Sequence, residues 1–258
     1  MRSRFLPEGR LLHTPENEAA CASRDGLRRA MEEETVLEGV AQLCDGAHNL
    51  LVSVGPFTGF LPREEAALGI AEGTTREIAI LSRVGKPVCF QITALEESEG
   101  VIRPRLSRRR AQQAALDAML AGLHPGCILP AVVTHLESFG AFVDIGCGVP
   151  SLIGIENISV SRIPHPDQRF RVGQAIFAVV QELDPKLGRV YLTHRELLGT
   201  WAENAARFQA GMTVPGIVRG LKEYGAFVEL TPNLSGLAER KNGLREGDRV
   251  SVYIKAIL

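Results

Sequence analysis

A short aromatic motif that occurs twice constrains the fold of this chain more than any other feature. The pentapeptide FGAFV at residues 139–143 returns as YGAFV at residues 224–228. Each copy follows an apolar run and precedes a turn containing Gly, Pro or Asn and then a leucine-centred segment. The order is strand, aromatic hairpin, turn and strand, and its recurrence is typical of tandem copies of one small domain.

The surroundings of the first motif predict a complete small domain. Strands are expected near residues 127–135, 139–146, 151–155, 174–183 and 189–193, with a short helical or irregular connector at 155–163. Five short strands with one helical insertion after the third favour a small Greek-key barrel.

The same pattern divides the whole chain. We predict a mainly β fold of three tandem five-stranded β-barrels joined by short α-helices. The predicted segments are a helical lead-in at 1–34, a divergent barrel at 35–106, a helical linker at 107–125, a barrel at 126–193, a helical linker at 194–210 and an incomplete barrel at 211–258. The third copy ends inside its expected fourth strand and lacks its last strand. We expect that the natural chain continues or that a partner completes the copy.

Local signals refine the boundaries. Thr14 before Pro15 predicts a helix start, and Asp25 is a candidate cap for a second helical turn. Ser107 is expected to cap a helix that ends near residue 123. Within the first copy we expect a short helix at 63–73, a strand at 78–82 and a polar turn at 96–100.

Composition excludes several classes of function. The chain has 258 residues, is 45% hydrophobic and 23% charged, and has a formal net charge of −1. Near-neutral charge argues against a protein that holds duplex DNA mainly by neutralising phosphates. No window approaches the roughly 18 apolar residues of a membrane span, and the N-terminus lacks the apolar core of a signal peptide. We therefore expect a cytoplasmic protein with no membrane partner.

Cysteine and histidine spacing predicts neither a disulfide framework nor a metal site. The five cysteines are scattered and never form a C-x-x-C pair, and the six histidines show no H-x₃-H pairing. Such isolated residues are most simply packing, surface or turn residues. We expect no cofactor and no bound metal.

The second copy resembles the S1 RNA-binding domain family, whose members adopt an oligonucleotide/oligosaccharide-binding (OB) barrel. The resemblance rests on five ordered segments: Gly126 with the FGAFV motif, Leu152 with Ile153, Phe170 with Gly173, Val179 with Asp184, and the run GRVYLT at 188–193. The third copy matches through Gly211, the YGAFV motif, Gly236 with Leu237, and Gly247. The first copy matches only in pattern. The tandem arrangement resembles that of bacterial ribosomal S1 proteins and their shorter relatives.

Strand alternation indicates how the motif can bind a base. Phe142 and Asp144 are expected on one outer face, while the alternate residues of 141–145 fill the barrel. Phe139 lies an odd number of residues from Phe142, and a bulge at Gly140 is expected to bring both rings to one side. An exposed ring is a stacking platform worth about 1–3 kcal/mol per base and tolerant of sequence. The alternative is that one phenylalanine only fills the core.

The resemblance implies further site residues. In the family the platform is completed by a His in the third strand and by an Asp and an Arg around the last hairpin. Asp184 and Arg189 match in the second copy, but Gly154 stands at the His position. The third copy presents Tyr224 and Phe227, with Glu239 at the His position, while Arg219 and Lys222 are expected to place cations beside its rings. The predicted RNA-binding residues are therefore Phe139, Phe142, Asp184, Arg189, Arg219, Lys222, Tyr224 and Phe227.

The first copy departs from this pattern. His48 and Leu51 occupy its aromatic positions and Pro62 its His position. We expect it to be a structural or protein-contacting domain. The arginine run at 108–110 is expected to be a solvated helix face, with phosphate contact as the alternative.

Three classes of function follow from these features. The first is non-catalytic binding of single-stranded RNA, with messenger RNA and the small ribosomal subunit as partners in translation. The alternative is a protein-interaction module that docks on the ribosome or an RNA-processing complex with little direct RNA contact. An enzyme is third, because nucleophile-elbow, zinc-protease and phosphate-loop motifs are absent from the sequence, and no small-molecule substrate is expected.

Overall fold

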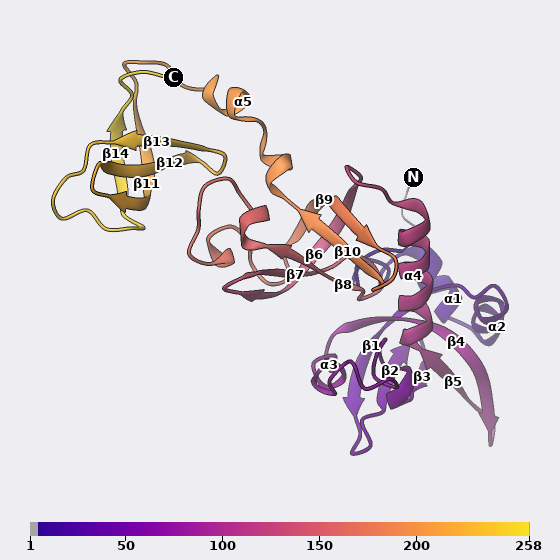
Figure 1. The fold of residues 1–258 in the computed structure, drawn as a ribbon. Helices are drawn as coiled ribbons and strands as arrows, with labels where there is room; N and C mark the ends of the chain where they lie inside the picture. The colour runs from indigo at the N-terminus through magenta and orange to yellow at the C-terminus, as the bar shows by residue number, and fades with distance from the viewer. Residues whose placement is uncertain (1–4, 258) are drawn as a thin grey trace. The chain divides into compact units, whose positions relative to one another are not determined.

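The computed structural model describes residues 5–257, which divide into two compact units (Figure 1). Unit 1 comprises the described residues up to Leu123 together with Asp144–Pro150. Unit 2 comprises His124–Val143 and the described residues from Ser151 onward. Residues 1–4 of the predicted lead-in and Leu258 lie outside the described residues. Within the described part of the chain, no helix combines the length and apolar character that a bilayer crossing requires.

Unit 1 contains a closed five-stranded barrel where the first copy is predicted. Its strands are β1 (Leu37–Cys44), β2 (Leu50–Val54), β3 (Phe57–Leu61), β4 (Pro87–Ser98) and β5 (Val101–Ser107), closed in the order β1-β2-β3-β5-β4. Only the β3–β5 pairing is parallel, which suits a Greek-key barrel of the OB type. Leu50, Leu61, Phe90 and Leu106 are fully buried in its core.

The helices before this barrel agree in part with prediction. Helix α1 (Pro15–Cys21) begins at the predicted Thr14 cap. Helix α2 (Arg24–Glu32) is capped by the Ser23 hydroxyl, so the prediction that Asp25 is the cap is wrong. Asp25 lies instead in the first turn, where its negative charge suits the positive end of the helix dipole.

The segment between β3 and β4 differs from prediction. A 3-10 turn, η1 (Arg63–Glu65), occupies part of the helix predicted at 63–73, and helix α3 (Ile78–Leu81) replaces the strand predicted at 78–82. A short apolar run cannot be assigned by periodicity alone, and here Ile80 is buried whereas Ile78 is 64% exposed. The polar turn predicted at 96–100 is shorter, because β4 continues into it.

Helix α4 (Arg108–Gly122) confirms the first predicted linker helix. The Ser107 hydroxyl accepts a hydrogen bond from Arg110 N at 2.9 Å and caps its first turn. Arg108, however, is buried, so the expectation of a solvated arginine run is wrong at that residue. Arg109 pairs with Glu65 at 2.8 Å.

A buried charge network explains the position of Arg108. Its guanidinium donates to the Glu8 carboxylate at 2.6 and 3.0 Å, and Arg83 donates to the same carboxylate at 3.0 Å. Glu8 N donates to Asp144 Oδ2 at 2.7 Å. Asp144 is expected on the same outer face as Phe142, but it is only 4% exposed, because the N-terminal segment covers it. Burial and then the nearby Glu8 charge raise the pKa of Asp144 to about 7.

Apart from Asp144 and Pro150, the strands of the second barrel belong to unit 2, and they lie within two residues of the predicted bounds. They are β6 (Ile128–Glu137), β7 (Gly140–Asp144), β8 (Pro150–Gly154), β9 (Ala175–Asp184) and β10 (Arg189–Thr193), closed in the order β10-β8-β7-β6-β9. Ala141, Val143 and Ile145 are buried as predicted. The connector after β8 contains two 3-10 turns, η2 (Ile155–Asn157) and η3 (Pro166–Gln168).

The second linker is not one continuous helix. A 3-10 turn, η4 (Arg195–Leu198), and helix α5 (Trp201–Ala205) are separated by Gly199. Gly199 has a φ of 81°, a left-handed conformation that interrupts a right-handed helix. Thr200 then starts α5 through a capping box with Glu203.

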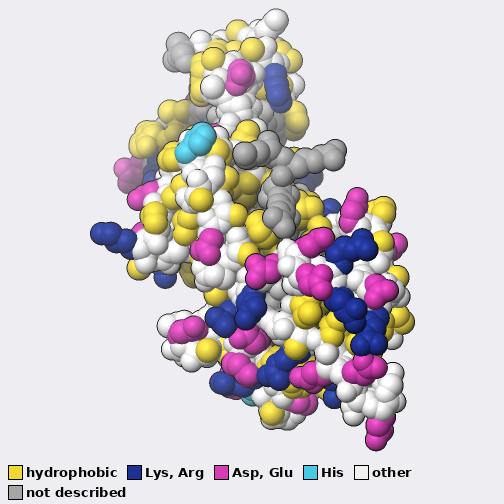
Figure 2. All heavy atoms as spheres, turned by 90° about the vertical axis from the view of Figure 1, so that its right-hand side faces the viewer, with side chains coloured by type: hydrophobic (Ala, Val, Ile, Leu, Met, Phe, Trp, Pro, Cys, Tyr) yellow, Lys and Arg dark blue, Asp and Glu magenta, His cyan; other side chains and the backbone are white. Residues whose placement is uncertain are grey.

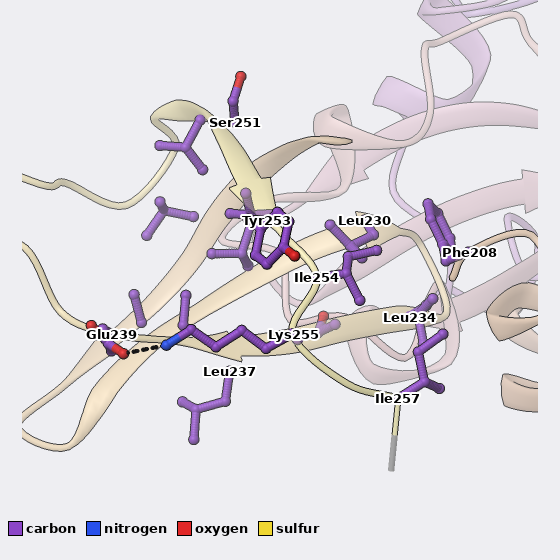
Figure 3. Close-up of a pocket in the computed structure, with 18 of the residues that line it drawn as sticks. Phe208, Leu230, Leu234, Leu237, Glu239, Ser251, Tyr253, Ile254, Lys255 and Ile257 are labelled. Carbon is purple, nitrogen blue, oxygen red and sulfur yellow. Dashed lines mark hydrogen bonds and ion pairs between the residues drawn. The ribbon is translucent and has the colours of Figure 1, made fainter. Parts of the chain in front are cut away.

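The third copy is an open sheet in the described residues. Strands β11 (Thr213–Lys222), β12 (Gly225–Thr231), β13 (Leu234–Ala238) and β14 (Arg249–Tyr253) lie in the order β13-β12-β11-β14. Val218, Ala226 and Val228 form its buried centre. These three residues also line a cavity of about 780 Å³. Figure 3 shows other residues that line it, among them Leu230, Leu234 and Tyr253. A mainly β fold is thus confirmed, with two closed barrels and one four-stranded sheet.

Candidate nucleic-acid interface

The two phenylalanines of the first motif form a ring pair on the second barrel. Phe139 and Phe142 meet edge to face, with ring centroids 6.0 Å apart and an interplanar angle of 88°. Phe139 is 54% exposed, whereas Phe142 is half-buried. Both rings therefore lie together, as the sequence predicts.

The cause of this pairing is different from the predicted bulge. Phe139 precedes β7, which begins at Gly140, so strand alternation does not apply to it. A Cβ on Gly140 would lie 2.5 Å from Ile153 O of the neighbouring strand β8. Glycine is needed at this position because two backbones approach closely, and its φ is not left-handed.

Two further residues of this surface escape the sequence-based prediction. His135, on β6, lies with its ring 6.3 Å from that of Phe142, and its Nε2 is 2.7 Å from Glu137 Oε1. Tyr191, on β10, pairs in register with Leu152 of β8. The alternation of β10, in which Val190 and Leu192 are buried, turns Tyr191 outward and is the sequence signal that identifies it.

The predicted pair at the last hairpin has a partly structural role. Asp184 and Arg189 lie directly opposite each other on β9 and β10. Asp184 Oδ1 accepts hydrogen bonds from the backbone N–H groups of Lys186 and Leu187, both at 3.0 Å, and so shapes the turn. Arg189 is exposed and makes no side-chain hydrogen bond or ion pair within the described chain. Its guanidinium is open to a ligand.

The third sheet repeats the ring pair of the second barrel. Tyr224 and Phe227 meet edge to face, with centroids 6.3 Å apart and an angle of 87°. Tyr224 is 70% exposed. Phe227 lies opposite Leu237, which is 59% exposed, and Lys222 lies exposed at the end of the same hairpin.

Of the two cations expected beside these rings, one is exposed and the other is buried in an ion pair. Lys222 is exposed, but the Arg219 side chain is 6% exposed and donates to Glu229 at 2.6 Å. Glu239, at the predicted His position, accepts a hydrogen bond from Lys255 Nζ at 2.7 Å (Figure 3). That hydrogen bond and the Lys255 charge hold the pKa of Glu239 below its usual range.

The first barrel carries a different surface at the corresponding place. His48 lies in the β1–β2 turn with a φ of 64°, and its Nδ1 is 2.7 Å from Glu77 Oε2. Leu51 pairs with Leu43 on one side and with Phe60 on the other. Among the described residues, unit 1 has no pair of aromatic rings in contact like those of the other two copies. On the visible face of unit 1, basic and acidic side chains are interspersed (Figure 2).

The described residues include no group of three or more His, Cys, Asp or Glu side chains arranged to hold a metal ion.

Comparison with known proteins identifies relatives of this chain. Residues 123–195 match the family described as S1 RNA binding domain. The chain is 30% identical over 222 residues to small ribosomal subunit protein bS1 of Leuconostoc lactis, covering 80% of this chain and 49% of that protein. It is 29% identical over 218 residues to bS1 of Neisseria meningitidis, covering 82% of this chain and 37% of that protein. The chain thus spans less than half the length of either relative.

A solved structure, the a/eIF2alpha–aDim2p–rRNA complex from Pyrococcus horikoshii, is 22% identical with a TM-score of 0.29, covering 33% of this chain and 51% of that one. The family match falls on the second barrel, where the described ring pair lies. Residues 123–195 therefore belong to the S1 RNA-binding domain family, and most of the chain is related in sequence to the bacterial small-subunit protein bS1.

Proposed function

We propose that this protein is a non-catalytic binder of single-stranded RNA that stacks bases on the ring pairs of the second barrel and the third sheet. The observation that carries the proposal is the recurrence of one geometry. Phe139 with Phe142 and Tyr224 with Phe227 have the same edge-to-face contact, and the first ring of each pair is more than half exposed. Exposed aromatic rings are the stacking platforms of proteins that bind single strands.

The charge distribution supports a single strand over a duplex. The formal net charge is −1, so neutralisation of phosphates contributes little overall. Arg189 and Lys222 are exposed and lie at the hairpins of the second barrel and the third sheet. Stacking requires bases that are not already stacked in a helix, and it tolerates any base sequence.

The relatives suggest where such binding is used. Because two relatives are named as proteins of the small ribosomal subunit, we place this protein in translation, with messenger RNA as its ligand and that subunit as a partner. Asp184 is assigned to shaping the hairpin that presents Arg189. Arg219 is assigned to the contact with Glu229.

A second candidate function applies to the first barrel. Its corresponding surface presents Leu43, Leu51 and Phe60, with Leu43 49% exposed. An apolar surface of this kind suits protein contact more than base stacking. Pull-down from an extract before and after nuclease treatment separates the two functions, since partners held through the first barrel remain without RNA.

The test of RNA binding is the double variant Phe142→Ala with Phe227→Ala. Loss of two stacked bases, at about 1–3 kcal/mol each, predicts a fall in affinity of at least about thirtyfold for an unstructured oligoribonucleotide. Fluorescence anisotropy measures it. Phe177→Ala is the matched control, because Phe177 is 61% exposed but belongs to neither ring pair. Equal affinities of the double variant and the control contradict the stacking proposal.

A further inference from the structure

A buried carboxylate joins the second barrel to the third sheet within unit 2. Glu229, on β12, accepts hydrogen bonds at 2.6 Å from Arg219 Nε of β11 and from Arg169 Nη2 of the connector between β8 and β9. The three side chains are 7%, 6% and 13% exposed, respectively. Separating buried charges leaves one of them uncompensated, so this contact resists opening.

The connector also contacts Arg219 of the third sheet. Arg219 Nη1 donates to Gln168 Oε1 at 3.3 Å, so Arg219 contacts its own sheet and the second barrel at once. Arg169 Nε is buried and has no hydrogen-bond partner among the described residues. Burial of this N–H without a partner costs solvation, and the hydrogen bonds of Arg169 to Glu229 and to Gln168 O, the latter at 3.3 Å, offset that cost.

A second group of contacts lies at the β12–β13 turn. Asn233 Oδ1 accepts a hydrogen bond from Val160 N at 3.1 Å. Asn233 Nδ2 donates to Arg195 O at 2.9 Å and to Gly199 O at 2.7 Å. One side chain of the third sheet thus binds the connector of the second barrel and the linker between the two domains.

Hydrogen bonds on both sides of Asn233 extend this group. Ser161 N donates to Pro232 O at 3.0 Å, and the Ser161 and Ser235 hydroxyls are 2.8 Å apart. Thr231 Oγ1 donates to Asn204 Oδ1 of α5 at 2.8 Å. The contact therefore involves the connector, the linker and the third sheet together.

We infer that these contacts form a fixed junction that presents the two ring pairs to one RNA strand as a single site. The inference rests on the proposed function. When two domains are joined by a flexible linker, the linker sets the effective concentration at which the second domain binds the strand. A fixed arrangement of the two domains avoids the entropic cost of ordering the linker on binding. Arg219, Arg169, Glu229 and Asn233 are then positioning residues, which act on RNA through the arrangement of the rings.

The first experiment needs no RNA. ¹⁵N relaxation of the full chain gives the rotational correlation times of the second barrel and the third sheet, which are expected to be equal. In the double variant Arg169→Met with Asn233→Ala they are expected to diverge. The Glu229–Arg219 pair within the third sheet remains in this variant. Different correlation times in the unaltered protein overturn the junction, and equal ones in the double variant overturn the positioning role of Arg169 and Asn233.

The second experiment compares two probes by anisotropy, a uridine oligoribonucleotide of about 4 nucleotides and one of about 20. The double variant is expected to keep the affinity for the short probe within about twofold and to lose about tenfold for the long probe. Arg162→Met is the matched control, an exposed arginine of the same connector without a side-chain partner in the described chain. An equal loss for both probes, or none for the long probe, contradicts the inference. Absence of binding by the unaltered protein refutes the proposed function instead, and leaves the relaxation result standing.

Discussion

The rings of Phe139 and Phe142 meet edge to face. An odd offset of three residues within one strand would place them on opposite faces, but Phe139 lies in the turn before β7 and only Phe142 lies within the strand. The close approach of Gly140 to Ile153 O brings the start of β7 against β8. The position of the ring pair therefore depends on a backbone contact that a side chain would block.

Gly140→Ala is expected to destabilise the protein by about 1–3 kcal/mol, because the new Cβ would lie 2.5 Å from a backbone oxygen. Urea unfolding measures the change. The control is Gly236→Ala in β13, where a Cβ meets nothing within 4 Å and the φ is not left-handed. Equal unfolding midpoints for the two variants contradict the packing argument.

The buried carboxylate of Asp144 makes stability depend on pH. Its pKa in the folded protein is about 7, above the ordinary value of 3.8, so the folded state holds this proton more tightly than the unfolded state. The stabilisation is fully present below about pH 3.8 and is lost as the pH rises through about 7.

Asp144→Asn is therefore expected to remove this contribution and to flatten the fall in unfolding free energy between about pH 4 and pH 7. Urea unfolding at a series of pH values measures the slope. Asp117→Asn, at an exposed position on α4, is the control. A slope for Asp144→Asn that equals that of the unaltered protein shows that Asp144 does not titrate in this range.

Tyr191 is expected to extend the binding surface of the second barrel beyond the predicted residues. Tyr191→Ala should lower affinity for a single-stranded oligoribonucleotide about tenfold, the value of one stacked base. Tyr253→Ala is the control, because Tyr253 is 63% exposed but lies on β14 of the third sheet and not on the second barrel. If anisotropy shows the same loss of RNA affinity for both variants, Tyr191 is not part of the RNA-binding surface.

Lys222 is expected to contact one phosphate beside the ring pair of the third sheet. Lys222→Ala should then weaken RNA binding and lower the slope of log affinity against log salt by about 0.7, the value for one phosphate contact on a single strand. The control is Lys86→Ala, an exposed lysine of the first barrel. If the slope of log affinity against log salt is the same for Lys222→Ala and for the control, Lys222 does not contact a phosphate.

The second barrel could be predicted closely from sequence because its aromatic motif and turn glycines fix where each strand begins and ends. Ala141, Val143 and Ile145 are buried as alternation requires. The helix at Ile78–Leu81 could not be predicted, since a run of four apolar residues carries no clear period.

The errors around the site come from contacts between distant segments. The sequence predicts Arg219 beside the rings of the third copy and Asp144 on an outer face of the second. In the structure Glu229 and Gln168 bind Arg219, and the segment containing Glu8 covers Asp144. Local patterns cannot show which outward side chain another part of the chain will bury.

The most direct measurement of the central claim is an NMR titration of the ¹⁵N-labelled full chain with a short uridine oligoribonucleotide. Stacking predicts the largest shift changes at amides of residues 139–143 and 224–228, where the two ring pairs lie. Residues 50–54 of the first barrel should remain unchanged. Shift changes confined to the first barrel, or none at either ring pair at saturating RNA, contradict the account.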